Sequence, residues 1–301
     1  MLRREEGRPD GRDKIRILLA TGLLFAPLVS CLILEACSSN SSNTEVPAAI
    51  AVDIYQDMES GSGGDPLTSA LMNASSYGPG SWNPTAGTMW VSNDNSRPLP
   101  GPVVVGGTTY PGKGGTRSWA FLDAFQQNFV TTMFPSDHLK VTVACFLTVG
   151  PTCLFYNPFD ALAMQGISIF SVLQGLGEDS GGPYLRAHSC IAGPVSTFSA
   201  NHIKVIAGKT YWVNLQYDGP AGKTRVAAYD PDNGFAQVGP ILVADSVTGA
   251  GIQYFSCGRS DTHGDNPDCP TQSHLDNIII DYTYGKFPLI PGVATAGNYG
   301  Q

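Results

Sequence analysis

Charged side chains are scarce in this chain, and basic ones are scarcest. Asp, Glu, Lys and Arg make up 14% of the 301 residues, and the formal net charge is -8. The first 36 residues hold six of the 17 Lys and Arg and five of the 25 Asp and Glu, so the remainder carries -9. A protein that binds the phosphate backbone of nucleic acid needs a basic surface, so we expect no nucleic-acid partner.

Glutamate is nearly absent after residue 36, where only Glu45, Glu59 and Glu178 occur. Most glycosidases need two carboxylates that flank the scissile bond. No two of these glutamates lie close together in the sequence, and no Asp-x-Asp pair lies on an expected strand. The sequence therefore predicts no catalytic residues of that kind and favours a protein that is not an enzyme.

The apolar run near the N-terminus is too short to cross a membrane easily, which takes roughly 20 residues. This run, Ile17–Val29, is broken by Thr21, Gly22 and Pro27 and follows a polar segment with a slight excess of positive charge. Such a pattern is typical of a secretory signal. We therefore expect residues 1–36 to be a signal peptide that directs export.

Two cysteines stand at the end of this segment. Leu28–Cys31 and Leu34–Cys37 each resemble the lipobox of bacterial lipoproteins, in which a lipidated cysteine becomes the new N-terminus. We expect a lipid on Cys37 or Cys31 that attaches the protein to a membrane, followed by a Ser/Asn-rich tether over residues 37–48. An ordinary cleaved signal peptide and an uncleaved N-terminal anchor are the alternatives.

Five cysteines lie in the domain that follows the tether, and an oxidising compartment favours disulfides between close pairs. The expected pairs are Cys257 with Cys269 and Cys145 with Cys153, because each pair brackets a turn-rich segment. Pairing of Cys153 with Cys190 is an alternative to the second pair. The spacing does not offer the compact set of four thiolates or imidazoles that zinc needs.

Short apolar segments run through the rest of the chain, and Gly, Pro, Asp or Asn separates almost every pair. This pattern predicts strands nearly throughout, with one domain over residues 49–290 and a flexible tail over 291–301. Short helices are expected after Asp65-Pro66 and over residues 120–130, where a broad strand fits equally well. The expected strands are 50–55, 88–92, 102–105, 117–122, 139–147, 167–173, 184–190, 202–206, 210–217, 224–230, 241–245, 252–257 and 275–282.

The segment Thr210–Asp218 alternates most clearly, so its side chains divide between two faces of a strand. One face is apolar and is expected to be core: Tyr211, Val213, Leu215 and Tyr217. An indole flanked by amides and a guanidinium suits stacking on and hydrogen bonding to a sugar ring. The other face, with the returning strand, supplies such a set, which we predict to bind the ligand: Trp212, Asn214, Gln216 and Arg225. Burial of this face under another strand or loop is the alternative.

A family resemblance follows from these segments. The hairpin between Ala207 and Tyr229, and a later Asp276-Asn277-Ile278 strand, resemble the central hairpin and closing strand of the concanavalin A-like superfamily of lectins, laminin-G-like domains and glucanases. The resemblance implies an all-β fold, a two-sheet antiparallel jelly-roll β-sandwich with one or two short helices. It also implies carbohydrate as the ligand class. Lyases of this fold use Tyr, His, Arg and Gln on a concave sheet.

One loop offers hard oxygen ligands for a metal ion. Asp261, Asp265 and Asp268 lie among the eleven residues between Cys257 and Cys269, which that pair would close into a loop. Ca²⁺ takes six to eight oxygen ligands, and lectin-like sandwiches often carry this ion. Calcium is therefore the metal to test at this loop, and a solvated turn is the alternative interpretation.

These observations predict an exported, lipid-anchored protein of the cell envelope or cell surface. We expect a non-catalytic binding module, with a polysaccharide or cell-surface glycan as its partner. The alternatives are a polysaccharide lyase or hydrolase of the same fold and a purely structural surface domain.

Overall fold

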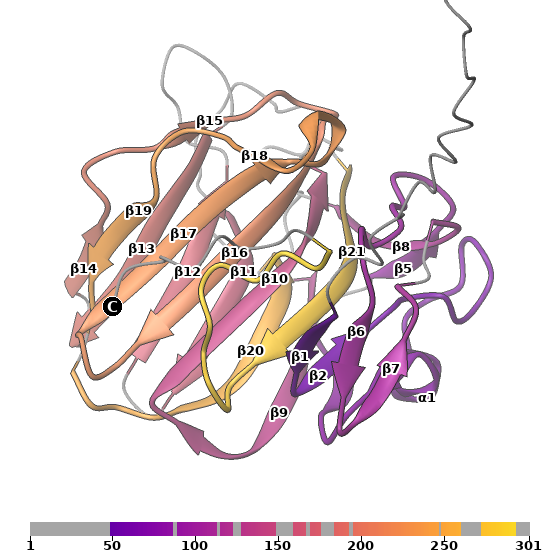
Figure 1. Ribbon diagram of the computed structural model, residues 1–301, viewed down its shortest axis with the longest axis horizontal. Coiled ribbons are helices and arrows are strands. Elements are labelled where there is room, and N and C mark those ends of the chain that lie inside the picture. The colour runs from indigo at the N-terminus through magenta and orange to yellow at the C-terminus, as the bar shows by residue number, and fades with distance from the viewer. Residues whose placement is uncertain are drawn as a thin grey trace, which may run out of the picture. The chain divides into compact units, whose positions relative to one another are not determined.

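A computed structural model describes residues 49–86, 89–112, 115–122, 128–148, 159–166, 169–175, 184–192, 195–246, 248–259 and 272–292. Two large sheets pack against each other in this part of the chain (Figure 1). The pairings within both sheets are antiparallel, which confirms the predicted all-β sandwich. Among the described residues, no helix has the length and apolar character of a membrane span.

The larger of the two has ten strands and is called the ten-stranded sheet below. Its central path, in spatial order, is β18 (Ala236–Gln237), β17 (Lys223–Asp230), β16 (Thr210–Asp218), β10 (Lys140–Thr148), β21 (Gln272–Asp281), β2 (Ile54–Gln56) and β3 (Ser76–Tyr77). Three strands join this path at the side: β19 (Leu242–Asp245) on β17, β8 (Ser118–Leu122) on β21, and β5 (Trp90–Ser92) on β8. Strands that are distant in the sequence are therefore neighbours at the centre of the sheet.

The second large sheet is called the eight-stranded sheet. Its path is β14 (Val195–Phe198), β13 (Tyr184–Ala192), β12 (Ile169–Gly175), β11 (Phe159–Gly166), β20 (Ile252–Arg259), β9 (Asn128–His138) and β4 (Ser81–Ala86), with β15 (Ile203–Lys204) beside β13. A small sheet completes the fold with β1 (Ile50–Val52), β6 (Val103–Val105) and β7 (Thr108–Tyr110). In it, β1 and β6 form a parallel pair.

One of the two predicted helices is present, but it starts later than predicted. Helix α1 spans Ser69–Ala74, and the Thr68 side chain caps it by accepting a hydrogen bond from the Leu71 amide. Pro66 instead forms a bridge with Trp90. For residues 120–130, the strand alternative is right and the helix wrong where the structure describes them, because β8 and β9 occupy the two ends. A 3-10 turn, Pro231–Asn233, follows β17.

The first core lies between the two large sheets. It contains large side chains of both sheets, such as Trp82, Trp119 and Phe255, each with no exposed surface. The expected inward face of β16 is confirmed, because its four residues all belong to this core: Tyr211, Val213, Leu215 and Tyr217. Alternation along β16 was therefore enough to identify the side chains that this strand contributes to the first core.

A second core covers the opposite face of the ten-stranded sheet. It combines side chains of that sheet with side chains of the small sheet and of the segment after β21, and its members include Tyr55, Val103, Phe146, Trp212, Ile279 and Leu289. On β21, Ile278 and Ile280 belong to the first core and Ile279 to the second. A strand packed on both faces needs such a continuous apolar run.

Two cysteines correct the predicted disulfides. Cys145 and Cys257 are free thiols in the first core, one on β10 and the other on β20. Both occupy inward-facing strand positions, so their side chains point into the core and not toward the loops that follow. The expected pairs Cys145–Cys153 and Cys257–Cys269 are therefore not formed, and burial raises the pKa of both thiols. The side chains of Cys153, Cys190 and Cys269 lie outside the described residues.

We predict that Trp212→Ala destabilises the fold as strongly as Leu215→Ala. Trp212 has no exposed surface, and its ring centroid lies 4.8 Å from that of Phe146. Truncation of either side chain leaves a cavity in a core. The free energy of unfolding, measured by urea denaturation, should therefore fall by about 3–5 kcal/mol for Trp212→Ala and by about 2–5 kcal/mol for Leu215→Ala. Val243→Ala, at a position 44% exposed, is the matched control. A Trp212 variant no less stable than this control would contradict the second core.

Candidate functional site

The predicted ligand-binding face of β16 is covered, which corrects its expected exposure. The alternation is right, but Trp212 and Asn214 have no exposed surface and Gln216 has 2%. The segment after β21 lies over these side chains and hydrogen-bonds to them through its backbone. The Trp212 Nε1 donates to the Leu289 carbonyl at 2.6 Å, and the Leu289 amide donates to the Asn214 Oδ1 at 2.6 Å. An indole held in this way presents no face to a sugar.

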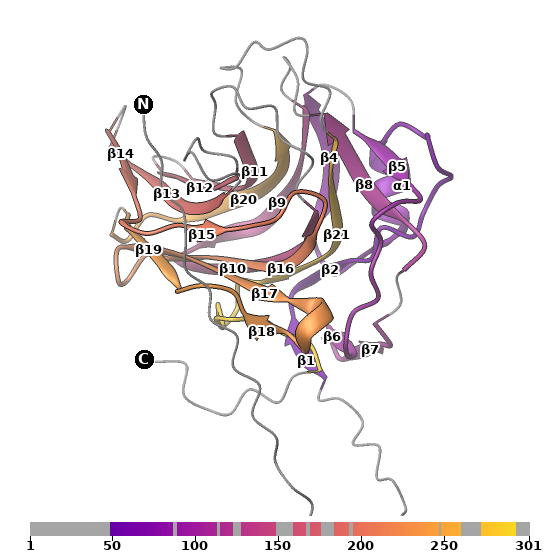
Figure 2. The same cartoon turned by 90° about the horizontal axis from the view of Figure 1, so that it is seen from above.

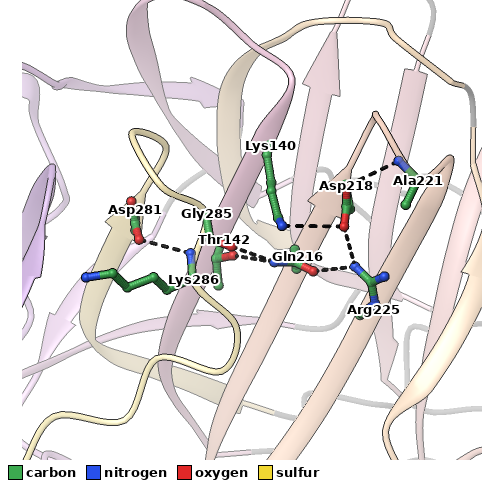
Figure 3. Close-up of polar contacts among 9 residues, drawn as sticks. All are labelled: Lys140, Thr142, Gln216, Asp218, Ala221, Arg225, Asp281, Gly285 and Lys286. Atoms are coloured by element: carbon green, nitrogen blue, oxygen red, sulfur yellow. Dashed lines mark hydrogen bonds and ion pairs between the residues drawn. The ribbon is translucent and has the colours of Figure 1, made fainter. Parts of the chain in front are cut away.

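Gln216 and Arg225 continue the same pattern at the other end of the covered face (Figure 3). The Gln216 Nε2 donates to the Gly285 carbonyl at 2.6 Å. Arg225 donates to the Gln216 Oε1 at 2.6 Å and to the Asp218 Oδ2 at 2.8 Å, while the Lys140 ammonium lies 3.6 Å from that carboxylate. Burial would raise the pKa of Asp218, but the Arg225 hydrogen bond and the Lys140 charge hold it below its usual value. Three residues of the predicted ligand set, Trp212, Asn214 and Gln216, therefore bind the backbone of the segment after β21, and the fourth, Arg225, binds Gln216 and Asp218.

The outer face of the eight-stranded sheet is the other sheet face to consider. Figure 2 shows that this sheet is curved and that its outer face, which is turned away from the ten-stranded sheet, is the concave one. Along β13, Leu185 and Ala187 point into the first core. Strand alternation therefore places Tyr184, Arg186 and His188 on the outer face.

Neighbouring strands bring aromatic and basic side chains to these three residues. The Arg186 guanidinium carbon lies 4.3 Å from the centroid of the Phe198 ring, and the His188 ring stacks on the same phenyl at 4.5 Å and 10°. The rings of Tyr184 and His202 lie 4.8 Å apart. Lys204 is the register partner of Tyr184 and is exposed. We call these six residues the β13 face: Tyr184, Arg186, His188, Phe198, His202 and Lys204.

The electrostatics of the β13 face favour hydrogen bonding to a neutral or anionic ligand. Within the described part of the chain, no carboxylate forms an ion pair with Arg186 or Lys204. Burial, with a smaller effect of the Arg186 charge, lowers the pKa of His188 to about 4. The imidazole is therefore neutral at neutral pH. Phe198 adds an apolar surface that is 41% exposed.

A second group of polar side chains lies on the same outer face, at β4, β9 and β20. Thr85 donates to the Thr131 Oγ1 at 2.8 Å, and the Thr131 and Ser256 hydroxyl oxygens lie 3.0 Å apart. Met133 is 46% exposed beside its register partner Tyr254, whose pKa is raised by burial. Three strand spacings separate β13 from β20, which is about 14 Å at 4.7–4.9 Å per strand. The face is thus long enough to contact an extended ligand at more than one point.

Three sets of predicted site residues lie outside the described residues: the calcium ligands Asp261, Asp265 and Asp268, the lipidation sites Cys31 and Cys37, and the disulfide partners Cys153 and Cys269. The calcium loop and the lipid anchor therefore stay predictions. Among the residues that the structure does describe, no three His, Cys, Asp or Glu side chains form a group that could hold a metal ion.

The β13 face was missed from the sequence, although one signal for it was present. The predicted strand 184–190 already places Tyr184, Arg186 and His188 on one face by alternation. Nothing in the sequence identifies Phe198 as the register partner of His188, because that contact depends on the pairing of β13 with β14. Strand alternation alone also gave no reason to prefer this face over that of β16.

No family model and no curated protein matches the chain. Solved structures match in part, and one is Domain 4 of AbnA, a GH43 extracellular arabinanase from Geobacillus stearothermophilus, in complex with arabinotriose. It has 14% identity, covers 76% of this chain and 91% of that chain, and has a TM-score of 0.40. Alginate lyase Aly36B has 11% identity, 55% and 80% coverage, and a TM-score of 0.40. Basic winged bean lectin with Tn-antigen has 12% identity, 67% and 91% coverage, and a TM-score of 0.32. The fold assignment rests on the sheets described above.

The lowered pKa of His188 predicts a stability that falls with acid. The folded pKa of about 4 lies below the unfolded value of 6.5, so the unfolded chain binds more protons between these values. The unfolding free energy should therefore drop by about 1–3 kcal/mol as pH falls from 6.5 to 4. Urea denaturation across this pH range should show a smaller drop in the unfolding free energy for His188→Gln than for the unmodified protein. An identical pH dependence in the two proteins would contradict the assignment.

Proposed function

We propose that the protein binds a polysaccharide or cell-surface glycan through the β13 face, without cleaving it. The observation that supports this proposal is the contact of Arg186 and His188 with the half-exposed ring of Phe198. Aromatic rings stack on the apolar faces of sugars, while guanidinium and imidazole nitrogens hydrogen-bond to hydroxyl or carboxylate oxygens. Further along the face, the hydroxyls of Thr85, Thr131 and Ser256 offer additional polar contacts.

The test is a glycan array with the chain from Thr44 onward, followed by titration of the best ligand. Phe198→Ala and Arg186→Ala should each weaken that binding by about fivefold or more, because one stacking ring commonly contributes about 1 kcal/mol. Tyr284→Ala is the matched control, an aromatic residue 67% exposed on the segment after β21. Equal affinities for all three variants would contradict binding at the β13 face.

A polysaccharide lyase is the second candidate function. It is favoured by one specific observation, namely that Tyr184, Arg186 and His188 bring a phenol, a guanidinium and a neutral imidazole to one sheet face. A neutral imidazole is in the unprotonated form that a general base requires. Product analysis on any glycan bound in the array separates the two functions, because a binding module leaves the chain length unchanged.

We further propose that the protein is exported and held on a membrane by a lipid on Cys37 or Cys31. The support is the signal-like segment before these residues and the Ser/Asn-rich stretch after them. Both cysteines precede the described part of the chain, which begins at residue 49.

Replacement of both Cys31 and Cys37 by Ser should release the protein from the membrane fraction. The two single variants then identify the lipidated residue, because only one of them should lose labelling by a palmitate analogue. Absence of label in the unmodified protein would contradict the lipid anchor and leave plain secretion.

A further inference from the structure

Basic side chains are scarce in this chain, and acidic side chains pair with many of them. The chain carries -9 after residue 36. Within the described residues, aspartates form ion pairs with five basic side chains: Arg97, Lys140, Lys209, Lys223 and Arg225. Arg186 and Lys204 of the β13 face differ, because neither forms an ion pair with a described carboxylate. An acidic chain thus presents two positive charges, unpaired with any carboxylate that the structure describes, on one sheet face.

Arg186 and Lys204 are close neighbours on this face. Lys204 is the register partner of Tyr184, which lies two residues from Arg186 on β13. The adjacent pair, Leu185 and Ile203, belongs to the first core, so Tyr184 and Lys204 share the outer face. Diagonal neighbours across an antiparallel pair lie about 7–8 Å apart. Both side chains are therefore long enough to contact the same bound group.

Among the described residues, carboxylates lie away from these charges or are paired elsewhere. Of the described side chains in the eight-stranded sheet, the one carboxylate is Asp137 on β9. Four strand spacings, or about 19 Å, separate β9 from β13. Asp245 of the other sheet lies beside β14, where its carbonyl accepts a hydrogen bond from Thr197, but its carboxylate is paired with Lys223. The described surroundings of Arg186 and Lys204 therefore carry a net positive charge.

The imidazole of His188 is affected by the same positive charge. Burial is the main cause of its lowered pKa, and the charge of Arg186 is the second cause. A neutral sugar leaves this positive charge uncompensated, whereas a carboxylate or a sulfate compensates it. Two like charges at the spacing of Arg186 and Lys204 also repel each other, so a bound anion stabilises the pair.

We propose, resting on the glycan function above, that the β13 face selects acidic glycans and holds a carboxylate or sulfate group between the Arg186 guanidinium and the Lys204 ammonium. A guanidinium forms two parallel hydrogen bonds to a carboxylate or to a tetrahedral oxyanion, and an ammonium adds a compact point charge. The charges of the face fix the anionic class of the ligand. The two sources of that charge, a uronate and a sulfate ester, are separate arms of the test.

The experiment is an array of neutral, uronate-containing and sulfated glycans, probed with the full chain. The best ligand is then titrated beside its own charge-free form, which is the methyl ester of a uronate or the desulfated form of a sulfated glycan. We expect the best ligand to be acidic. Removal of its charge should weaken binding by about tenfold, because two exposed ion pairs that each contribute about threefold are lost.

Salt gives a readout that needs no variant. Raising NaCl from about 0.1 M to about 1 M shortens the Debye length from about 10 Å to about 3 Å. The affinity for the acidic ligand should then fall by about threefold or more, while the affinity for the charge-free form should change little.

Arg186→Gln and Lys204→Gln should each weaken binding of the acidic ligand by about threefold and reduce its salt dependence. Lys204 is exposed, so its replacement removes a charge without opening the core. Lys286→Gln is the matched control, because the Lys286 ammonium also lies over an aromatic ring, 5.1 Å from the centroid of Tyr284, but on the segment after β21. This control should keep the affinity and the salt dependence of the unmodified protein.

Three results would overturn the proposal while glycan binding itself stands. They are a best ligand that is neutral, an acidic ligand whose affinity is unchanged by salt and by loss of its charge, and charge variants of Arg186 and Lys204 that bind as Lys286→Gln does. Absence of any bound glycan, acidic or neutral, would instead contradict the proposed function and this selectivity with it.

Discussion

The rest of the structure depends on the hydrogen bonds between β16 and the segment after β21. Trp212, Asn214 and Gln216 each use a side-chain group to bind the backbone of residues 285–289. Isolated polar groups would be costly on a buried sheet face, but here they satisfy backbone groups that cross the sheet without pairing as a strand. The ten-stranded sheet thereby becomes an interior layer with apolar packing on both sides.

Because that face is covered, we propose the outer face of the eight-stranded sheet as the ligand surface. The two faces differ in how their polar side chains are used. On the covered face, Arg225 and Gln216 are bonded to Asp218 and to the chain itself. On the β13 face, Arg186 contacts the Phe198 ring and forms no ion pair with a described carboxylate. The proposed glycan contact would use the N–H donors of this guanidinium.

Much of the fold could be predicted from the sequence because a strand reports its two faces locally. Alternation correctly assigned Tyr211, Val213, Leu215 and Tyr217 to the core. The unbroken run at Ile278–Ile280 is likewise a local pattern, and it agrees with a strand buried on both faces. What covers Trp212 could not be predicted, since the carbonyl that it binds lies 77 residues away in the sequence. Periodicity shows that a face exists, but it does not show which distant segment packs on it.

The predicted disulfides and the predicted helix over residues 120–130 were wrong for related reasons. Cys145 and Cys257 are close in sequence to Cys153 and Cys269, but their strands direct both thiols into the core. Residues 120–130 place Phe121, Phe125 and Phe129 at a spacing that suits a helix, yet pairing with β21 and β20 makes the two ends strands. In both cases sheet pairing, which is non-local, overrides a local pattern.

The central claim is that ligand binding occurs on the eight-stranded sheet and not on the covered face of β16. Chemical-shift mapping of an isotope-labelled chain, titrated with an oligosaccharide selected on the array, tests this claim most directly. The account predicts that the shifted backbone amides cluster in Tyr184–Ala192 and around Phe198, while those of Thr210–Asp218 and of residues 285–290 stay unchanged. Shifts concentrated in β16 and the segment that covers it would contradict the account.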